Sequence, residues 1–258
     1  MNVHPHPGYR IDSRGVATLR IESGGPLNII SSATARALAD ALRRMGRDPA
    51  LRVAVITGSG EKTFIGGADI KELAALDPAR AREFISDLHA LCEAARDLPV
   101  PTIARVRGWC IGIGLELAAS CDLRVASTDA RFVMPEVKIG IPSVIQGALL
   151  ARLVGEGRAR WLMLTGEDIG ADTAERWGLV NEVAAADRLD EAVDRLAASM
   201  AAMGPAGLRA QKRVLRTGEA PHLDAGMLHS IDLFAQAYET TEPASRMQAF
   251  LQRKRPKG

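Results

Sequence analysis

Aromatic residues and cysteines are scarce in this chain, and long uninterrupted apolar runs are missing. Aromatic residues make up 4% of its 258 positions, and the cysteines are Cys92, Cys110 and Cys121. Their odd number and the lack of a CxxC pair argue against a disulfide framework, so we expect a reduced, cytoplasmic setting. The first residues lack the apolar run of a signal peptide, and no stretch is apolar enough to span a membrane.

An excess of charge of either sign is missing as well. The 33 basic and 31 acidic residues leave a net charge of +2, which gives no case for a nucleic-acid surface. Five histidines are scattered without metal-ligand spacing, so we expect no metal site. Hydrophobic residues make up 47% and charged residues 25%, which is typical of a globular protein able to bury a large core.

The order of the predicted elements indicates an α/β fold. Strands are expected at 16–21, 51–57, 103–106 and 122–126, and helices at 32–46 and 78–97, with Gly46 as a C-terminal cap. From Leu189 onward the pattern is helical throughout. We place a boundary near Gly204, which divides a core at 1–203 from a region of three helices at 204–258. No internal sequence repeat is found.

One glycine-containing segment combines a helix start with a lone carboxylate. Residues 108–122 read GWCIGIGLELAASCD, and a helix is predicted to begin near Ile113. Its first amides have no intrahelical partner, and Gly112 allows the backbone to come close to a ligand. Glu116 lies in the first turn of an apolar helix, so we expect it to be buried. A buried carboxylate is costly unless it is partnered or functional, and both interpretations stay open here.

Two further segments have a similar character. In residues 64–72 (FIGGADIKE), two glycines precede a helix start, so free amides are expected near Ala68. Residues 132–143 (FVMPEVKIGIPS) hold Glu136 between two prolines. Taken alone, the first segment is interpreted as an ordinary strand-to-helix loop, and Glu136 in the second as a solvated loop glutamate. Two sources of free amides matter more together, because an oxyanion hole needs two donors that converge on one oxygen.

Together these segments resemble the enoyl-CoA hydratase/isomerase (crotonase) family. GLELAASCD, KTFIGGADIKEL and FVMPEVKIGIP are similar to its three motifs in order and spacing, and LTGEDIGADTAERWGLVNEV and MQAFLQRKR extend the resemblance over nearly the whole chain. The resemblance implies a spiral of ββα units with a helical C-terminal region used to form a homotrimer or a dimer of trimers. It also implies an acyl-CoA thioester as substrate and no cofactor besides the coenzyme A of that substrate.

The resemblance also implies roles for particular residues. The backbone N–H groups of Ala68 and Ile113 would form the oxyanion hole, and Glu116 and Glu136 match both glutamates of the hydratases. Substrate and coenzyme A binding would fall to Gly66, Gly67, Asp69, Ile70, Lys71, Gly112, Phe250 and Arg253. The chain departs from the family at Ile113, where glycine is common, and at 143–147 (SVIQG), where many hydratases have a glycine-rich turn.

The activity implied is addition of water across the 2,3 double bond of a 2-enoyl-CoA, giving a 3-hydroxyacyl-CoA. Two carboxylates that flank one water can hold it and move its protons. A Δ3-Δ2-enoyl-CoA isomerase needs only one carboxylate, and a hydrolase or decarboxylase on the same fold is a further alternative. A non-catalytic acyl-CoA-binding or interaction protein requires neither glutamate, so the presence of Glu116 and Glu136 weighs against it.

Overall fold

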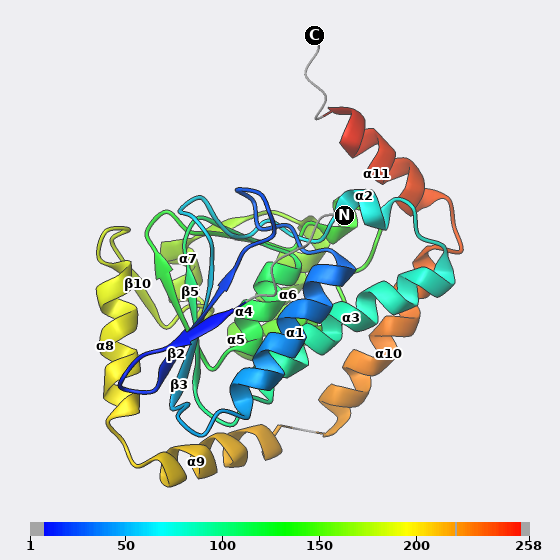
Figure 1. The fold of residues 1–258 in the computed structure, drawn as a ribbon. Helices are drawn as coiled ribbons and strands as arrows, with labels where there is room; N and C mark the ends of the chain where they lie inside the picture. Colours follow the sequence, from blue (N-terminus) through cyan, green and yellow to red (C-terminus); the bar gives the residue numbers. More distant parts are fainter. Residues whose placement is uncertain (1–7, 220, 254–258) are drawn as a thin grey trace.

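Two β-sheets form the centre of the molecule (Figure 1). The structure, a computed structural model, describes residues 8–219 and 221–253. The larger sheet contains, in spatial order, β1 (Tyr9–Ile11), β2 (Val16–Ile21), β3 (Val53–Gly58), β5 (Thr102–Val106), β7 (Leu123–Ser127) and β10 (Glu182–Ala184). The smaller sheet contains β4 (Thr63–Ile65), β6 (Trp109–Ile111), β8 (Arg131–Val133) and β9 (Ile169–Gly170).

The chain winds between the two sheets in a repeated order. A strand of the larger sheet is followed by a strand of the smaller sheet and then by a helix, as in β3, β4 and α2 (Ile70–Leu73). The same order recurs in β5, β6 and α4 (Ile113–Ser120), and in β7, β8 and the 3₁₀ helix η1 (Glu136–Ile139). Strands β3, β5 and β7 pair in parallel, as do β4, β6 and β8. The predicted spiral of ββα units is confirmed.

Helices cover both faces of the larger sheet. On one side α1 (Ser32–Gly46) packs against α3 (Pro78–Arg96). Ser31 caps α1 by accepting a hydrogen bond from the amide of Thr34, as the sequence indicates. The prediction that Gly46 caps the other end is wrong, because Arg47 takes that position in a right-handed conformation. A Cβ at Gly46 would lie 3.2 Å from the Leu98 side chain, so glycine serves close packing there.

The rest of the chain is mainly helical. The connecting elements are η2 (Ile145–Gly147), α5 (Ala148–Val154), α6 (Glu156–Thr165) and α7 (Ala171–Arg176). Helix α8 (Leu189–Ala201) packs on the outer face of the larger sheet. The three helices expected after Gly204 are α9 (Pro205–Thr217), α10 (Pro221–Ala237) and α11 (Glu242–Arg253). Helix α10 lies along α3, and α11 packs on α2 and η1 (Figure 1). A division into two regions at Gly204 stays a prediction.

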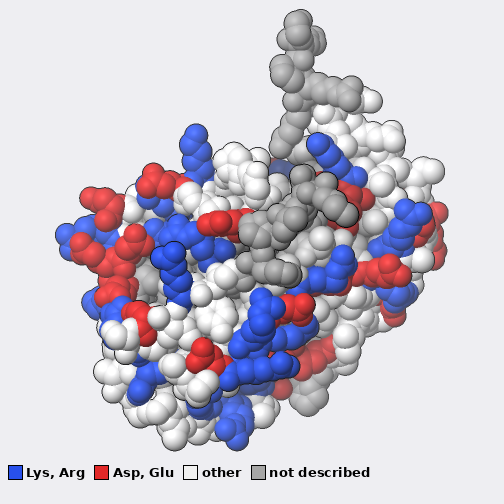
Figure 2. Space-filling model, viewed as in Figure 1, with Lys and Arg blue, Asp and Glu red and all other residues white. Residues whose placement is uncertain are grey.

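The surface follows the charge balance of the sequence. On the face drawn in Figure 2, basic and acidic side chains lie interspersed, as expected from 33 basic and 31 acidic residues. Across the two described ranges, no helix combines the length and apolar character needed to cross a membrane.

Candidate active site

A cavity of about 90 Å³ lies where three parallel strands of the smaller sheet end. Its lining includes residues 66–68 after β4, residues 112–113 after β6, and residues 135–136 after β8. Parallel strands present their carboxyl ends at the same edge of a sheet, so segments far apart in sequence meet there. The structure therefore brings together the three motifs that the sequence singles out.

Two backbone amides at this cavity have no hydrogen-bond acceptor within the part of the chain that the structure describes. The segment before α2 is held by a bridge in which the Ile30 amide donates to Gly67 O at 3.0 Å and the Asp69 amide donates to Ile30 O at 2.9 Å. That bridge leaves the N–H of Ala68 between them without a partner among the described residues. Ile113 is the first residue of α4, and its N–H likewise has no partner in the described ranges. Both residues line the cavity.

Gly112 is required by the close approach of the third motif. Its φ of 53° lies in the left-handed region, and a Cβ there would lie 2.5 Å from Glu136 Oε1. Glycine therefore lets the carboxyl group of Glu136 approach the start of α4. The Ile113 side chain, which replaces the more common glycine, is 3% exposed and packs in the hydrophobic core. Its bulk is accommodated by the core, and its amide stays at the cavity.

Glu116 is buried, as predicted from its apolar helix. It is 4% exposed, and its Oε1 accepts a hydrogen bond from the Gly147 amide at 3.0 Å. Burial raises the pKa of Glu116 well above its ordinary value, the nearby Glu136 carboxyl raises it further, and the Gly147 amide lowers it. The environment therefore favours a protonated Glu116 whenever Glu136 is charged.

Glu136 stands at the start of η1 on the same cavity. Burial raises the pKa of Glu136 to about 7, while hydrogen bonds from its own backbone amide and from Ser143 act in the opposite direction. The Ser143 hydroxyl donates to Glu136 Oε2 at 2.8 Å. Ser143 belongs to the segment that departs from the family, so that departure supplies a hydrogen-bond donor to a cavity carboxyl. The two glutamates form a coupled pair that disfavours double ionisation.

Apolar side chains complete the cavity. Phe84, Ile85 and Leu88 come from one face of α3, and Phe234 comes from α10 in the C-terminal part of the chain. None of these four residues was singled out individually from the sequence. The helical spacing of Phe84, Ile85 and Leu88 predicts a shared buried face, but no local pattern indicates that Phe234 meets it. The cavity thus combines two free amides, two carboxyl groups and an apolar wall.

Comparison with known proteins identifies the family to which this chain belongs. A family model described as enoyl-CoA hydratase/isomerase matches residues 12–257. The chain belongs to the enoyl-CoA hydratase/isomerase family. It is 34% identical to the crotonyl-CoA hydratase of Syntrophomonas wolfei over 93% of both chains, and 32% identical to the short-chain-enoyl-CoA hydratase of Clostridium acetobutylicum over 94% of both.

Solved structures agree with this membership. An enoyl-CoA hydratase from Mycobacterium avium subsp. paratuberculosis superposes with a TM-score of 0.84 at 28% identity, covering 98% of this chain and 99% of that one. An enoyl-CoA hydratase from Bacillus halodurans shares the fold with a TM-score of 0.88 at 21% identity, covering 95% of this chain and all of that one. The predicted crotonase family and fold class are confirmed, and the family is one of enzymes.

The predicted coenzyme A-binding residues divide into two sets. Gly66, Gly67, Ile70 and Gly112 line the cavity. The others, Asp69, Lys71, Phe250 and Arg253, are not among its lining residues in the described ranges.

These outlying residues have other surroundings. The Asp69 carboxylate accepts a hydrogen bond from the Lys71 amide at 2.9 Å and so caps α2, while the Lys71 side chain is exposed. Phe250 is half-buried on α11, which packs beside α2, and the side chain of Arg253 lies outside the described residues. Their roles in coenzyme A binding stay predictions.

Proposed function

We propose that this enzyme adds water across the 2,3 double bond of a short-chain 2-enoyl-CoA and releases the 3-hydroxyacyl-CoA. The observation that carries the proposal is that the carboxyl groups of buried Glu116 and half-buried Glu136 meet two backbone amides at one cavity, and that these amides have no hydrogen-bond partner among the described residues. The similar proteins, a crotonyl-CoA hydratase and a short-chain-enoyl-CoA hydratase, support the same reaction class.

The amides act on the thioester carbonyl. As water attacks C3, electron density moves through the conjugated system to the thioester oxygen, which becomes enolate-like. The N–H groups of Ala68 and Ile113 are fixed by the backbone and stabilise that charge without reorganising. The partial positive charge at the start of α4 adds to this stabilisation.

The carboxyl pair moves the protons. In the working state Glu116 and Glu136 hold one proton between them, because each raises the cost of ionising the other. The ionised member accepts a proton from water as the oxygen bonds to C3. The protonated member gives its proton to C2, so the pair again holds one proton when the product forms.

The arrangement of the glutamates favours hydration over the alternatives. An isomerase requires a single carboxyl to carry a proton between two carbons, which leaves the second without a task. A binding protein requires neither carboxyl group. Withdrawing the two carboxyls from water would therefore cost free energy without serving its function. The hydrogen bonds from Gly147 to Glu116 and from Ser143 to Glu136 hold both groups at the same cavity, as a two-carboxyl mechanism demands.

The test is turnover of crotonyl-CoA, followed by loss of the absorbance of its conjugated double bond, beside turnover of a 3-enoyl-CoA. Hydration predicts rapid loss of the crotonyl-CoA signal and formation of 3-hydroxybutyryl-CoA. Faster consumption of the 3-enoyl-CoA, with 2-enoyl-CoA accumulating, would establish an isomerase instead. An unchanged spectrum with bound thioester would establish a binding protein.

We further propose a homotrimer or a dimer of trimers. Large apolar side chains stand exposed on the C-terminal helices, where Val214 is 63%, Leu215 60% and Leu228 57% exposed. Exposed apolar groups of this kind mark contact surfaces. We also propose that the enzyme works in the cytoplasm and needs no cofactor besides the coenzyme A of its substrate. The three free, buried cysteines suit a reducing compartment.

A further inference from the structure

The turn that replaces the family's glycine-rich segment contains an unusual backbone. Ile145 has a φ of 41°, a left-handed conformation that a β-branched residue rarely adopts. Such a conformation persists only where the surroundings hold it in place, and it is often found near functional sites. Two residues later, the Gly147 amide donates the hydrogen bond to Glu116. The shape of this turn therefore determines where the Glu116 carboxyl is held.

The residue between these two is anchored by its side chain. Gln146 is completely buried, and its amide nitrogen donates to Glu93 Oε1 at 2.7 Å. The same side chain lies within hydrogen-bond distance of His89 Nδ1, with atoms 3.1 and 3.3 Å apart. Glu93 and His89 both belong to α3, so one rigid helix fixes the side chain from outside the turn.

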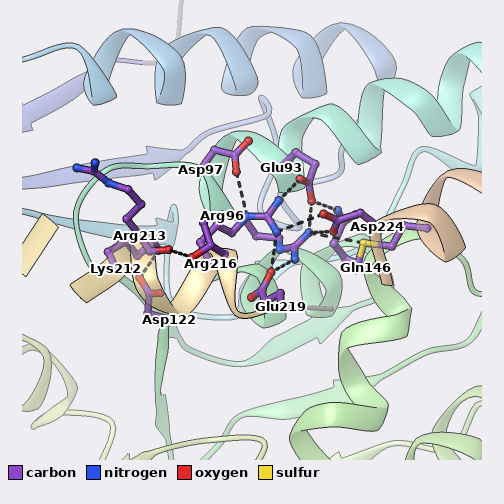
Figure 3. Close-up of polar contacts among 12 residues, drawn as sticks. Glu93, Arg96, Asp97, Asp122, Gln146, Lys212, Arg213, Arg216, Glu219 and Asp224 are labelled. Atoms are coloured by element: carbon purple, nitrogen blue, oxygen red, sulfur yellow. Dashed lines mark hydrogen bonds and ion pairs between the residues drawn. The ribbon is translucent and has the colours of Figure 1, made fainter. Parts of the chain in front are cut away.

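Glu93 is itself held in a network of arginines (Figure 3). Arg216 of α9 donates to Glu93 Oε2 at 2.8 Å, and Arg96, which is 4% exposed, pairs with Glu93 Oε1. Glu219 bridges the two guanidinium groups. With both oxygens of Glu93 engaged, its Oε1 offers Gln146 an acceptor of fixed direction.

A second contact fixes the strained residue from the other side. The Ile145 amide donates to the Ser230 hydroxyl of α10 at 2.8 Å, and that hydroxyl donates to Met227 O at 2.6 Å. The turn is thus held by α3 through Gln146 and by α10 through Ser230. Neither Gln146 nor Ser230 is among the described residues that line the cavity.

We propose that Gln146 is a positioning residue for Glu116, because its buried amide holds the peptide whose N–H orients the Glu116 carboxyl. The inference rests on the proposed function, in which Glu116 belongs to the proton-transferring pair. Gln146 does not line the cavity and acts only through the Gly147 amide, the single hydrogen-bond donor to the Glu116 carboxyl within the described ranges. Without its anchor on α3, the turn relaxes and Glu116 loses its fixed orientation.

The experiment replaces Gln146 by leucine, which keeps much of the volume and removes the hydrogen bonds. We expect kcat for crotonyl-CoA hydration to fall roughly 10- to 100-fold, since a small misplacement of a catalytic group costs this much. The Kd of unreactive butyryl-CoA stays within about threefold, because the cavity walls are unchanged. Glu219→Gln is the matched control: it alters the same arginine network but does not contact Gln146, and it leaves kcat within about twofold.

A double-mutant comparison separates positioning from a merely structural role. If Gln146 acts through Glu116, the loss caused by Gln146→Leu disappears in the Glu116→Gln background, because residues that act as a unit are not additive. The same loss in both backgrounds, or wild-type kcat in folded Gln146→Leu, overturns the proposal. If Gln146→Leu does not fold, Ser230→Ala loosens the same turn and must show the same dependence on Glu116. Unimpaired hydration by Glu116→Gln alone would instead refute the proposed function.

Discussion

The two sides of the cavity are built in different ways. Near the expected position of the thioester, Ala68 and Ile113 present backbone amides that follow strand ends. Glu116 presents a carboxyl group that is held by a hydrogen bond. Another part of the lining consists of apolar side chains, among them Phe84 from α3 and Phe234 from α10. Among substitutions only proline removes a backbone N–H, whereas apolar side chains can be resized at modest cost. We therefore expect the amides and carboxyls to determine the reaction, and the apolar side chains to determine which acyl group is accepted.

The largest effect is expected at the carboxyl pair. Glu116→Gln and Glu136→Gln keep the shape but cannot accept a proton as a carboxylate does, so each lowers kcat for hydration by about 10²–10⁴ while butyryl-CoA still binds. The double variant is little worse than the poorer single variant. Steady-state kinetics with crotonyl-CoA measure this. If only one substitution lowers the rate, the reaction does not use the two carboxyls as a pair.

The next largest effect is expected at the backbone donors. Proline lacks an N–H and is well tolerated at the first position of a helix, so Ile113→Pro removes the donor with little strain on α4. We expect kcat to fall about 10²–10³-fold, and similarly for Ala68→Pro. Ile113→Ala is the control, since it removes the same side chain and keeps the amide. Equal rates for Ile113→Pro and Ile113→Ala, with circular dichroism unchanged, would exclude this amide from the mechanism.

A pH profile tests whether the pair shares one proton. The pKa of Glu136 is about 7 and that of Glu116 is raised, so below pH 7 both become protonated and none accepts a proton from water. We expect kcat/KM to fall about tenfold per pH unit on this acid side. Ser143→Ala removes a hydrogen bond that stabilises the Glu136 carboxylate, so the acid limb moves to higher pH. An acid limb near the ordinary glutamate value of about 4.3 would contradict the shift.

The smallest effect is expected at the apolar wall. Phe234→Ala enlarges the cavity, so the ratio of kcat/KM for 2-hexenoyl-CoA to that for crotonyl-CoA rises about tenfold, a typical gain for added methylene contacts. The rate with crotonyl-CoA changes far less than in the glutamate variants. Leu233→Ala is the control, because Leu233 is the neighbouring residue on α10 and is 46% exposed. A constant ratio in Phe234→Ala would remove this side chain from acyl selection.

Much of the catalytic side could be predicted from the sequence. The burial of Glu116 follows from the apolar residues around it, and the clustering of the three motifs follows from parallel strands that end at one edge. These features depend on local patterns and on a general rule of sheet geometry. The roles of Ala68, Ile113 and Glu136 stay predictions that the structure supports by position.

Other features are invisible in the sequence for physical reasons. The ββα unit recurs along the spiral, but no internal repeat is found in the sequence. The order of strands and helices repeats from unit to unit, whereas the residues that form them do not. Strand β1 was missed, since three residues are too few to show an alternating pattern. The contacts of Phe234 and Gln146 depend on how helices distant in sequence pack together, and local spacing carries no record of that packing.

The position of Phe234 bears on how enzymes of this kind diverge. It projects from α10, a helix that contributes no carboxyl or free amide among the described lining residues of the cavity. We therefore expect substrate preference to vary at Phe234 independently of the residues that carry the reaction. We expect a gene duplicate to acquire a new acyl preference through substitution at Phe234, provided that Ser230 on the same helix keeps its contact with the Ile145 amide.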